Sequence, residues 1–183
     1  MDPIAETKEE TQFVTLGIDR EVFAVPVATV QEIFDMRPIF RVPDSPAYFA
    51  GLIDVRGRAV PVIDLRVKLG LPAIAATENT RILVLGVEVK GRRLVLGLIA
   101  DRVFEVVALN TDAIMPPPDI GVKWRSDYIR GIAYRGDSFV IIFDLVRLFS
   151  SEEIAIIDQK AQQNHNAASG ERDTQALATA GAA

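Results

Sequence analysis

The chain lacks the residue types on which most catalytic and metal sites depend. It has no cysteine and a single histidine, His165, in 183 residues. Without cysteine there are no disulfides, no thiolate nucleophiles and no cysteine-ligated zinc. His165 stands in a polar, alanine-rich stretch, where it has no partner for a catalytic dyad or a metal. Glycine loops of the Walker or dinucleotide-binding type are also missing. The sequence therefore predicts a protein that is not an enzyme, with no catalytic residues, no metal and no cofactor.

Positive charge is also in short supply. The 20 basic residues are outnumbered by 25 acidic ones, which gives a formal net charge of −5. A nucleic-acid surface needs a basic face that collects phosphates. No apolar run approaches the roughly 20 residues that cross a bilayer, and residues 1–10 have no signal-peptide pattern. We therefore expect a cytoplasmic protein with no nucleic-acid partner and no membrane insertion.

What the chain does have is an internal repeat. Residues 48–69 and 128–149 each begin with Tyr, a large apolar residue, any residue and Gly. Each continues with an apolar strand, an Arg-Gly turn, a second apolar strand and Asp-Leu. The Arg-Gly pair shifts by one position between the copies, from 56–57 to 135–136. A hairpin tip tolerates such a shift because it carries no ladder register.

The upstream blocks recur in the same order, which extends the repeat to most of the chain. Residues 11–17 resemble 80–86, and residues 30–33 resemble 103–106. The repeat units are therefore about 11–70 and 80–149. Duplicated small β units are typical of scaffolds, and the seam between two copies is a place where partners can dock.

Short apolar segments separated by turn residues predict an all-β fold of small barrels rather than a parallel sheet. The expected strands are 13–18, 22–25, 30–34, 52–55, 59–63, 82–87, 94–99, 103–107, 132–134 and 139–143. Residues 65–69 can form one helical turn that ends at Gly70. Ser150 and Glu153 have the spacing of a capping box and predict a helix over about 151–162 that packs on a barrel. Residues 1–10 and 163–183 are expected to be a disordered leader and tail around a domain of residues 11–160.

Two sets of charged residues near strand ends are candidates for a role. Asp64 and Asp144 end equivalent strands, where a carboxylate can cap the N–H groups of the following turn or, less favoured, bind a ligand. Arg56 lies at a hairpin tip, near Arg58, and Glu32 is on a strand that can neighbour it. This Arg is either a solvated turn residue in an ion pair worth under about 1 kcal/mol, or an anchor for a partner. Residue type alone leaves both interpretations open.

These motifs in combination resemble the CheW family of bacterial chemotaxis coupling proteins. The resemblance lies in Gly-Leu-Ile-Asp-Val-Arg-Gly at 51–57, followed by Val-Pro-Val-Ile-Asp-Leu-Arg at 60–66. Further similar segments are 30–33, 100–103 and 131–145, and the likeness extends over about 11–160. One departure is Asp54, where the family usually has Asn. It places an extra negative charge near the Arg-Gly tip.

The resemblance implies two intertwined, five-stranded SH3-like barrels with a C-terminal helix, and a non-catalytic adaptor. Its implied partners are the regulatory domain of the histidine kinase CheA and the cytoplasmic tip of methyl-accepting chemoreceptors. The receptor helix would lie in a groove between the barrels, and the protein would be recruited to membrane-associated receptor arrays. The residues carried over to partner surfaces are Val30, Glu32, Arg56 and Gly57, and Arg58, which lies near Arg56 in the sequence, is expected to bind a partner with them.

Two alternatives remain open at this point. The chain can serve a related array that controls pili or development instead of flagella. It can also be a small barrel that binds nucleic acid or a small ligand, which the acidic balance and the absence of an aromatic-basic stripe disfavour.

Overall fold

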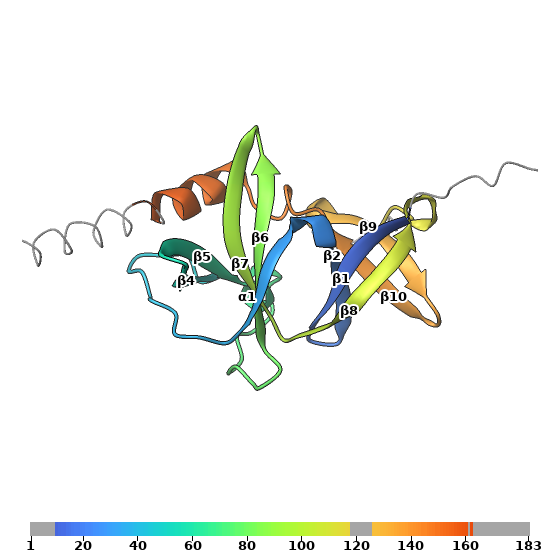
Figure 1. Cartoon of the computed structure of the whole chain (residues 1–183), viewed down its shortest axis with the longest axis horizontal. Coiled ribbons are helices and arrows are strands. Elements are labelled where there is room, and N and C mark those ends of the chain that lie inside the picture. Colours follow the sequence, from blue (N-terminus) through green and yellow to red (C-terminus); the bar gives the residue numbers. More distant parts are fainter. Residues whose placement is uncertain (1–9, 118–125, 161, 163–183) are drawn as a thin grey trace, which may run out of the picture.

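A computed structural model describes residues 10–117, 126–160 and 162 (Figure 1). Apart from Glu10, which begins the first strand, the expected leader and tail lie outside the described residues. In the described part of the chain, ten strands form two five-stranded sheets, which confirms the all-β, two-barrel prediction. The strands are β1 (Glu10–Ile18), β2 (Glu21–Pro26), β3 (Val30–Asp35), β4 (Phe49–Val55), β5 (Arg58–Asp64), β6 (Arg81–Val89), β7 (Arg92–Ala100), β8 (Arg102–Asn110), β9 (Ile129–Arg135) and β10 (Ser138–Phe143). No helix among these residues is long and apolar enough to cross a membrane.

Each sheet takes strands from both copies of the repeat. The first barrel has the order β8-β1-β2-β10-β9, and the second barrel has the order β3-β6-β7-β5-β4. Figure 1 shows the two sheets side by side. The antiparallel pair β1/β8 of the first barrel corresponds to β6/β3 of the second, and the parallel pair β2/β10 corresponds to β7/β5. The two barrels are thus pseudo-equivalent, and each copy contributes to both.

The two hairpins that end the copies have turns of equal length. Val55 pairs with Arg58 across the turn 56–57, and Arg135 pairs with Ser138 across the turn 136–137. The one-position shift in the Arg-Gly phrase is therefore not a shift in the hairpin. Arg135 is the last residue of β9 and the counterpart of Val55, whereas the turn residue equivalent to Arg56 is Gly136.

The core explains why these strands carry apolar residues on both faces. One cluster fills the first barrel around Phe13 and Ile142, and a second fills the second barrel around Val62 and Ile82. A third and larger cluster is shared by both barrels and includes Leu16. Fully burying a side chain of this size contributes about 1.5–3 kcal/mol. The seam between the barrels is therefore an apolar core, and it covers the strand faces that a tiny barrel cannot cover alone.

The strand-ending aspartates act as caps. Asp64 Oδ1 accepts hydrogen bonds from the backbone N–H groups of Arg66 and Val67, at 2.9 and 3.3 Å, and so begins helix α1 (Leu65–Lys68). Asp144 Oδ1 accepts from Val146 N and Arg147 N in the same way, both at 3.1 Å. The capping interpretation of both carboxylates is confirmed.

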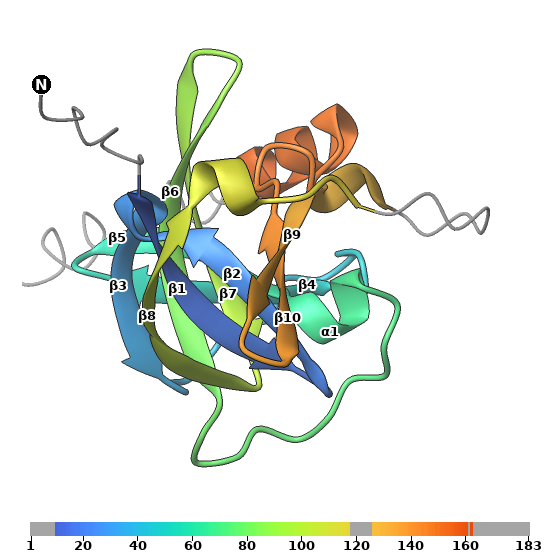
Figure 2. The same ribbon diagram turned by 90° about the vertical axis from the view of Figure 1, so that its right-hand side faces the viewer.

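The C-terminal helix, residues 151–160, begins with the predicted capping box. Glu153 N donates to Ser150 Oγ at 3.1 Å, and Ser150 N donates back to Glu153 Oε2 at 2.7 Å. Ile157 of this helix is fully buried in the shared cluster. In two perpendicular views the helix lies beside the β6–β7 hairpin (Figures 1 and 2).

Candidate partner-binding surfaces

The tip of the β4–β5 hairpin carries an exposed arginine held by an ion pair. Arg56 and Gly57 have φ angles of 53° and 80°, as the two central residues of a type I′ turn require. Arg56 Nη2 lies 2.8 Å from Glu32 Oε1, and the two side chains are 80% and 26% exposed. An ion pair with this exposure contributes under about 1 kcal/mol to the stability of the fold. The contact nevertheless joins the turn that follows β4 to β3, and these two strands are the edges of the second barrel.

Asp54, the departure from the family pattern, supports the same turn. Its Oδ1 accepts a hydrogen bond from Gly57 N at 2.7 Å, and its backbone oxygen accepts from Arg37 Nη1 at 3.3 Å. An Asn side chain offers the same acceptor at Oδ1. The departure therefore changes the charge at the tip and not the shape of the turn.

Four of the five predicted site residues gather at this tip, and one does not. Glu32 and Arg56 form the ion pair, Gly57 is in the turn, and the exposed Arg58 begins β5. Val30 is half-buried and packs against the shared apolar cluster at the seam. Its position favours a role between the barrels rather than at the hairpin tip.

The first barrel presents a pseudo-equivalent surface that sequence reasoning missed. Arg135 Nη2 lies 2.7 Å from Glu105 Oε1 and again joins the two edge strands, β9 and β8. The same strands also carry exposed apolar side chains, Phe104 and Val106 on β8 and Tyr134 and Phe139 on the β9–β10 hairpin, each between 49% and 60% exposed. The rings of Tyr134 and Phe139 are 4.6 Å apart. A patch of this kind marks an interaction site more often than a scattered surface residue does. The repeat could have indicated this surface, because it aligns Glu105 with Glu32.

A cavity of about 370 Å³ lies where the two barrels meet. Its walls are largely apolar and come from both barrels, with Pro26 and Phe143 from the first and Val87 from the second. Glu88 and Arg130 face it from opposite barrels. An apolar groove with charged positions at its margin suits an amphipathic helix.

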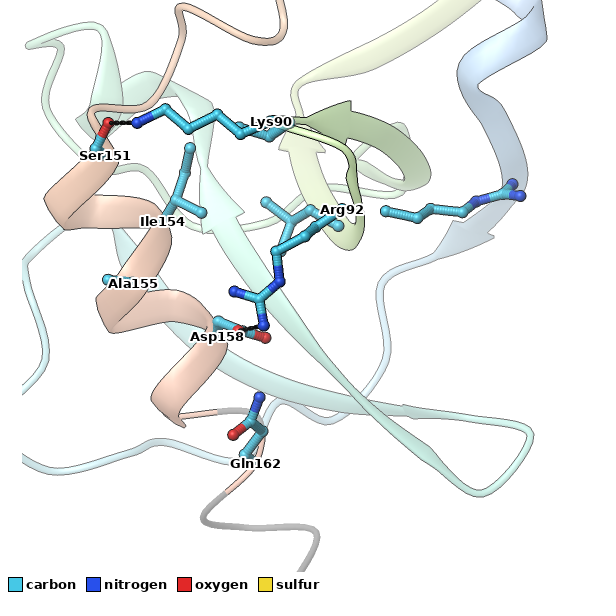
Figure 3. Close-up of a pocket in the computed structure, with 10 residues that line it drawn as sticks. Lys90, Arg92, Ser151, Ile154, Ala155, Asp158 and Gln162 are labelled. Atoms are coloured by element: carbon cyan, nitrogen blue, oxygen red, sulfur yellow. Dashed lines mark hydrogen bonds and ion pairs between the residues drawn. The ribbon is translucent and has the colours of Figure 1, made fainter.

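A second hollow, of about 290 Å³, separates the β6–β7 hairpin from the C-terminal helix (Figure 3). Lys90 Nζ donates to Ser151 Oγ at 2.9 Å across it, and Arg92 Nη2 lies 3.9 Å from Asp158 Oδ2. Ile154 and Ala155 supply apolar surface from the helix. The polar contacts hold the helix against the hairpin and do not pair a nucleophile with a base. Within the described residues, no three His, Cys, Asp or Glu side chains gather in a way that could hold a metal ion.

The start of the same helix is fixed by a cluster of opposite charges. Lys68 Nζ donates to Glu153 Oε1 and lies over the ring of Tyr48 at 4.7 Å. Burial and the neighbouring Glu153 carboxylate raise the pKa of Tyr48 to about 12. Burial opposes ionisation of Glu153, but hydrogen bonds from Lys68 and the Ser150 N–H outweigh it, and the pKa of Glu153 is lowered. These charges tie the helix to α1 of the second barrel.

Comparison with known proteins adds sequence and structural relatives. A family model described as the CheW-like domain matches residues 12–153. The chemotaxis protein CheW of Klebsiella aerogenes is 32% identical over 153 residues, which cover 84% of this chain and 90% of that protein. CheW of Treponema pallidum is 29% identical over 156 residues, covering 83% and 89%. The crystal structure of the scaffolding protein TtCheW from Thermoanaerobacter tengcongensis superposes with a TM-score of 0.69 at 28% identity, over 79% of this chain and 96% of that one.

Proposed function

This chain belongs to the CheW-like family of non-catalytic chemotaxis scaffold proteins, and on that premise we propose that it couples chemoreceptors to the histidine kinase CheA. The mechanism is geometric. Two separate surfaces of one rigid molecule hold two partners, so each partner raises the effective concentration of the other. The adaptor acts in the cytoplasm and reaches the membrane only through the receptors it binds.

The kinase contact is assigned to the tip of the second barrel, at Glu32, Arg56, Gly57 and Arg58. The observation that carries this assignment is the Arg56–Glu32 pair at 2.8 Å, with Arg56 80% exposed. Arg is enriched at binding hot spots. Because Glu32 already orders this long side chain, less conformational entropy is lost when a partner binds it. The regulatory domain of CheA is the proposed partner.

The receptor contact is assigned to the cavity between the barrels. Its apolar walls and its margin of Glu88 and Arg130 suit one face of a helix from the cytoplasmic tip of a receptor. Val30, half-buried at the seam, belongs with this contact rather than with the tip. The Glu105–Arg135 surface with its aromatic patch is assigned to a further component of the array, because it repeats the geometry of the kinase tip.

A ternary co-sedimentation assay tests the proposal. Receptor fragments that contain the hairpin tip are mixed with CheA, with and without this protein, and then pelleted. The kinase is expected in the pellet only when the protein is present. The Arg56→Glu variant should bind receptor fragments but carry little kinase down. If receptor fragments recruit the kinase equally well without the protein, the adaptor function is wrong.

A further inference from the structure

One buried arginine joins the two barrels at the place where the chain crosses between them. Arg66, in α1 of the second barrel, is only 7% exposed. Its Nη1 donates to Asp101 Oδ2 at 2.6 Å, and its Nη2 lies 3.4 Å from Asp19 Oδ1. Asp101 is the single residue between β7 of the second barrel and β8 of the first, and Asp19 begins the β1–β2 turn of the first barrel.

The network is closed by further hydrogen bonds. Arg66 Nε donates to the carbonyl oxygen of Pro72 at 3.0 Å, and Asp19 N donates to Asp101 Oδ2 at 2.7 Å. The guanidinium therefore has acceptors in both barrels and in the crossover itself. A buried charge is tolerated only with partners of this kind, and a buried ion pair is by itself weak evidence for added stability.

Among the described residues, the pseudo-equivalent seam shows no such network. The repeat places Val146 where Arg66 stands, since each is the second residue after a capping aspartate and donates its N–H to it. Ala28 takes the place of Asp101, and Lys90 takes the place of Asp19 as the first residue of the hairpin turn. Lys90 instead donates a hydrogen bond to Ser151 Oγ. At this second seam lies the 370 Å³ cavity, with Val146 in its wall.

We propose that Asp19, Arg66 and Asp101 form a clamp that sets the angle between the barrels and thereby the width of the groove at the other seam. Apolar packing alone holds the barrels together but is non-directional, so it does not define one angle. A planar guanidinium does, because its two terminal nitrogens bind two different carboxylates, Asp101 and Asp19, in fixed directions. Arg66 is thus a positioning residue for both partner surfaces, and this consequence depends on the proposed adaptor function.

Distance measurements on the free protein test the clamp directly. Because the chain has no cysteine, two spin labels can be placed without background. Cysteines at Glu88 and Arg130, both of which line the groove but in opposite barrels, report its width. Cysteines at the exposed Gln12 and Ser138 report distances within the first barrel only.

The variant Arg66→Gln is expected to broaden the 88–130 distance distribution roughly twofold, because two barrel angles become populated where one was. The 12–138 distribution should stay unchanged. Arg81→Gln is the matched control, since Arg81 pairs with Asp35 inside the second barrel at 3.3 Å. If Arg66→Gln does not fold, Asp19→Asn serves in its place, because Asn tolerates the φ of 56° at that position.

Two outcomes overturn the clamp. One is an unchanged 88–130 distribution in a folded clamp variant, and the other is broadening of both label pairs, which would indicate general loosening. A second measurement addresses the consequence for coupling. Clamp variants should bind the isolated CheA regulatory domain within about twofold of wild type but lose ternary recruitment, because only the ternary complex depends on how the two surfaces are arranged. If the wild-type protein itself recruits no kinase, the adaptor function fails while the distance result on the clamp stands.

Discussion

Arg56 and Glu32 lie 2.8 Å apart and join the turn after β4 to β3, the two edges of the second barrel. Arg135 and Glu105 do the same in the first barrel, at 2.7 Å. In each case the acid is on the strand of the repeat that follows a crossover, and the arginine is at the end of a hairpin. Each barrel therefore presents a cation on its rim that is already ordered by an acid of the same barrel.

The charge of Arg56 should matter for binding and not for folding. Arg56→Glu is expected to weaken binding of the CheA regulatory domain by about 30-fold, the loss of roughly 2 kcal/mol typical of a hot-spot arginine. The thermal midpoint should stay nearly unchanged because the ion pair is so exposed. Titration calorimetry and thermal unfolding of the same samples measure both.

Arg92→Glu is the matched control for this change. Arg92 also follows a hairpin turn, is 82% exposed and has only a weak contact with Asp158 at 3.9 Å. It should bind the kinase as wild type does. A large fall in the unfolding midpoint of Arg56→Glu would make Arg56 a structural residue and remove it from the interface.

The aromatic patch of the first barrel should be dispensable for folding. Phe139→Ser, which removes a ring that is 53% exposed, is expected to change the free energy of unfolding by no more than about 0.5 kcal/mol. It should reduce the size of receptor–kinase assemblies seen by light scattering. Ile74→Ser is the control, since Ile74 is equally exposed, at 52%, but lies in the loop between α1 and β6, outside the strands that carry Glu105 and Arg135. Assemblies reduced by both variants, or by neither, would argue against a docking role for the patch.

Two glycines of the first repeat copy should differ sharply in their tolerance of a side chain. An added Cβ at Gly51 would lie 2.2 Å from the carbonyl oxygen of Phe40, at a φ of +138°. Gly51→Ala should therefore lower the free energy of unfolding by about 3 kcal/mol or more, from overpacking and backbone strain together. At Gly57, with a φ of +80°, an added Cβ meets nothing within 4 Å, so Gly57→Ala should cost only about 1 kcal/mol.

Urea denaturation measures how much unfolding free energy each of the two variants loses. Equal losses would mean that strain at φ, and not the approach of Phe40, dominates at Gly51. The same two variants separate an effect on stability from an effect on partner binding. If Gly57→Ala weakens kinase binding with little loss of stability, the turn shape itself belongs to the interface.

The repeat, the hairpins and the caps could be predicted from sequence because they are local. Asp64 and Asp144 lie one residue before the turns they cap, and Ser150 and Glu153 are three apart on one helix. The exchange of strands between barrels could not be worked out from periodicity. Two similar copies contain the same apolar pattern, so the pattern does not say which copy's strand pairs with which, and only the resemblance implied intertwining.

In the candidate site, too, the features that could not be predicted from sequence depend on contacts between distant parts of the chain. The sequence did not decide whether Arg56 contacts Glu32, because the two residues are 24 positions apart and nothing in the sequence shows that they meet. The structure brings them together across the barrel opening. The aromatic patch was missed because Phe104 and Phe139 lie in apolar strands, where aromatic residues usually mark a core. Burial, which sequence does not show, decides between core and surface.

The attachment of the C-terminal helix should depend on pH through Glu153. The pKa of Glu153 is lowered from its ordinary value of 4.5, so its carboxylate stabilises the fold when ionised. That contribution is fully present above about pH 4.5 and is lost as the pH falls through the lowered pKa. Glu153→Gln should cost about 1 kcal/mol at pH 7, since it removes the negative charge that pairs with Lys68 and leaves one acceptor oxygen for Ser150 N in place of two, and much less at low pH.

Urea denaturation between pH 7 and pH 3 measures whether the unfolding free energies of Glu153→Gln and the wild-type protein approach each other as the pH falls. Glu152→Gln is the control, because Glu152 is its exposed neighbour in the same helix and, among the described residues, has no hydrogen bond to Lys68 or Ser150. It should show a smaller difference from wild type at pH 7. A Glu153→Gln difference that stays constant down to pH 3 would mean that shape and packing, and not the carboxylate charge, tie this helix to the second barrel.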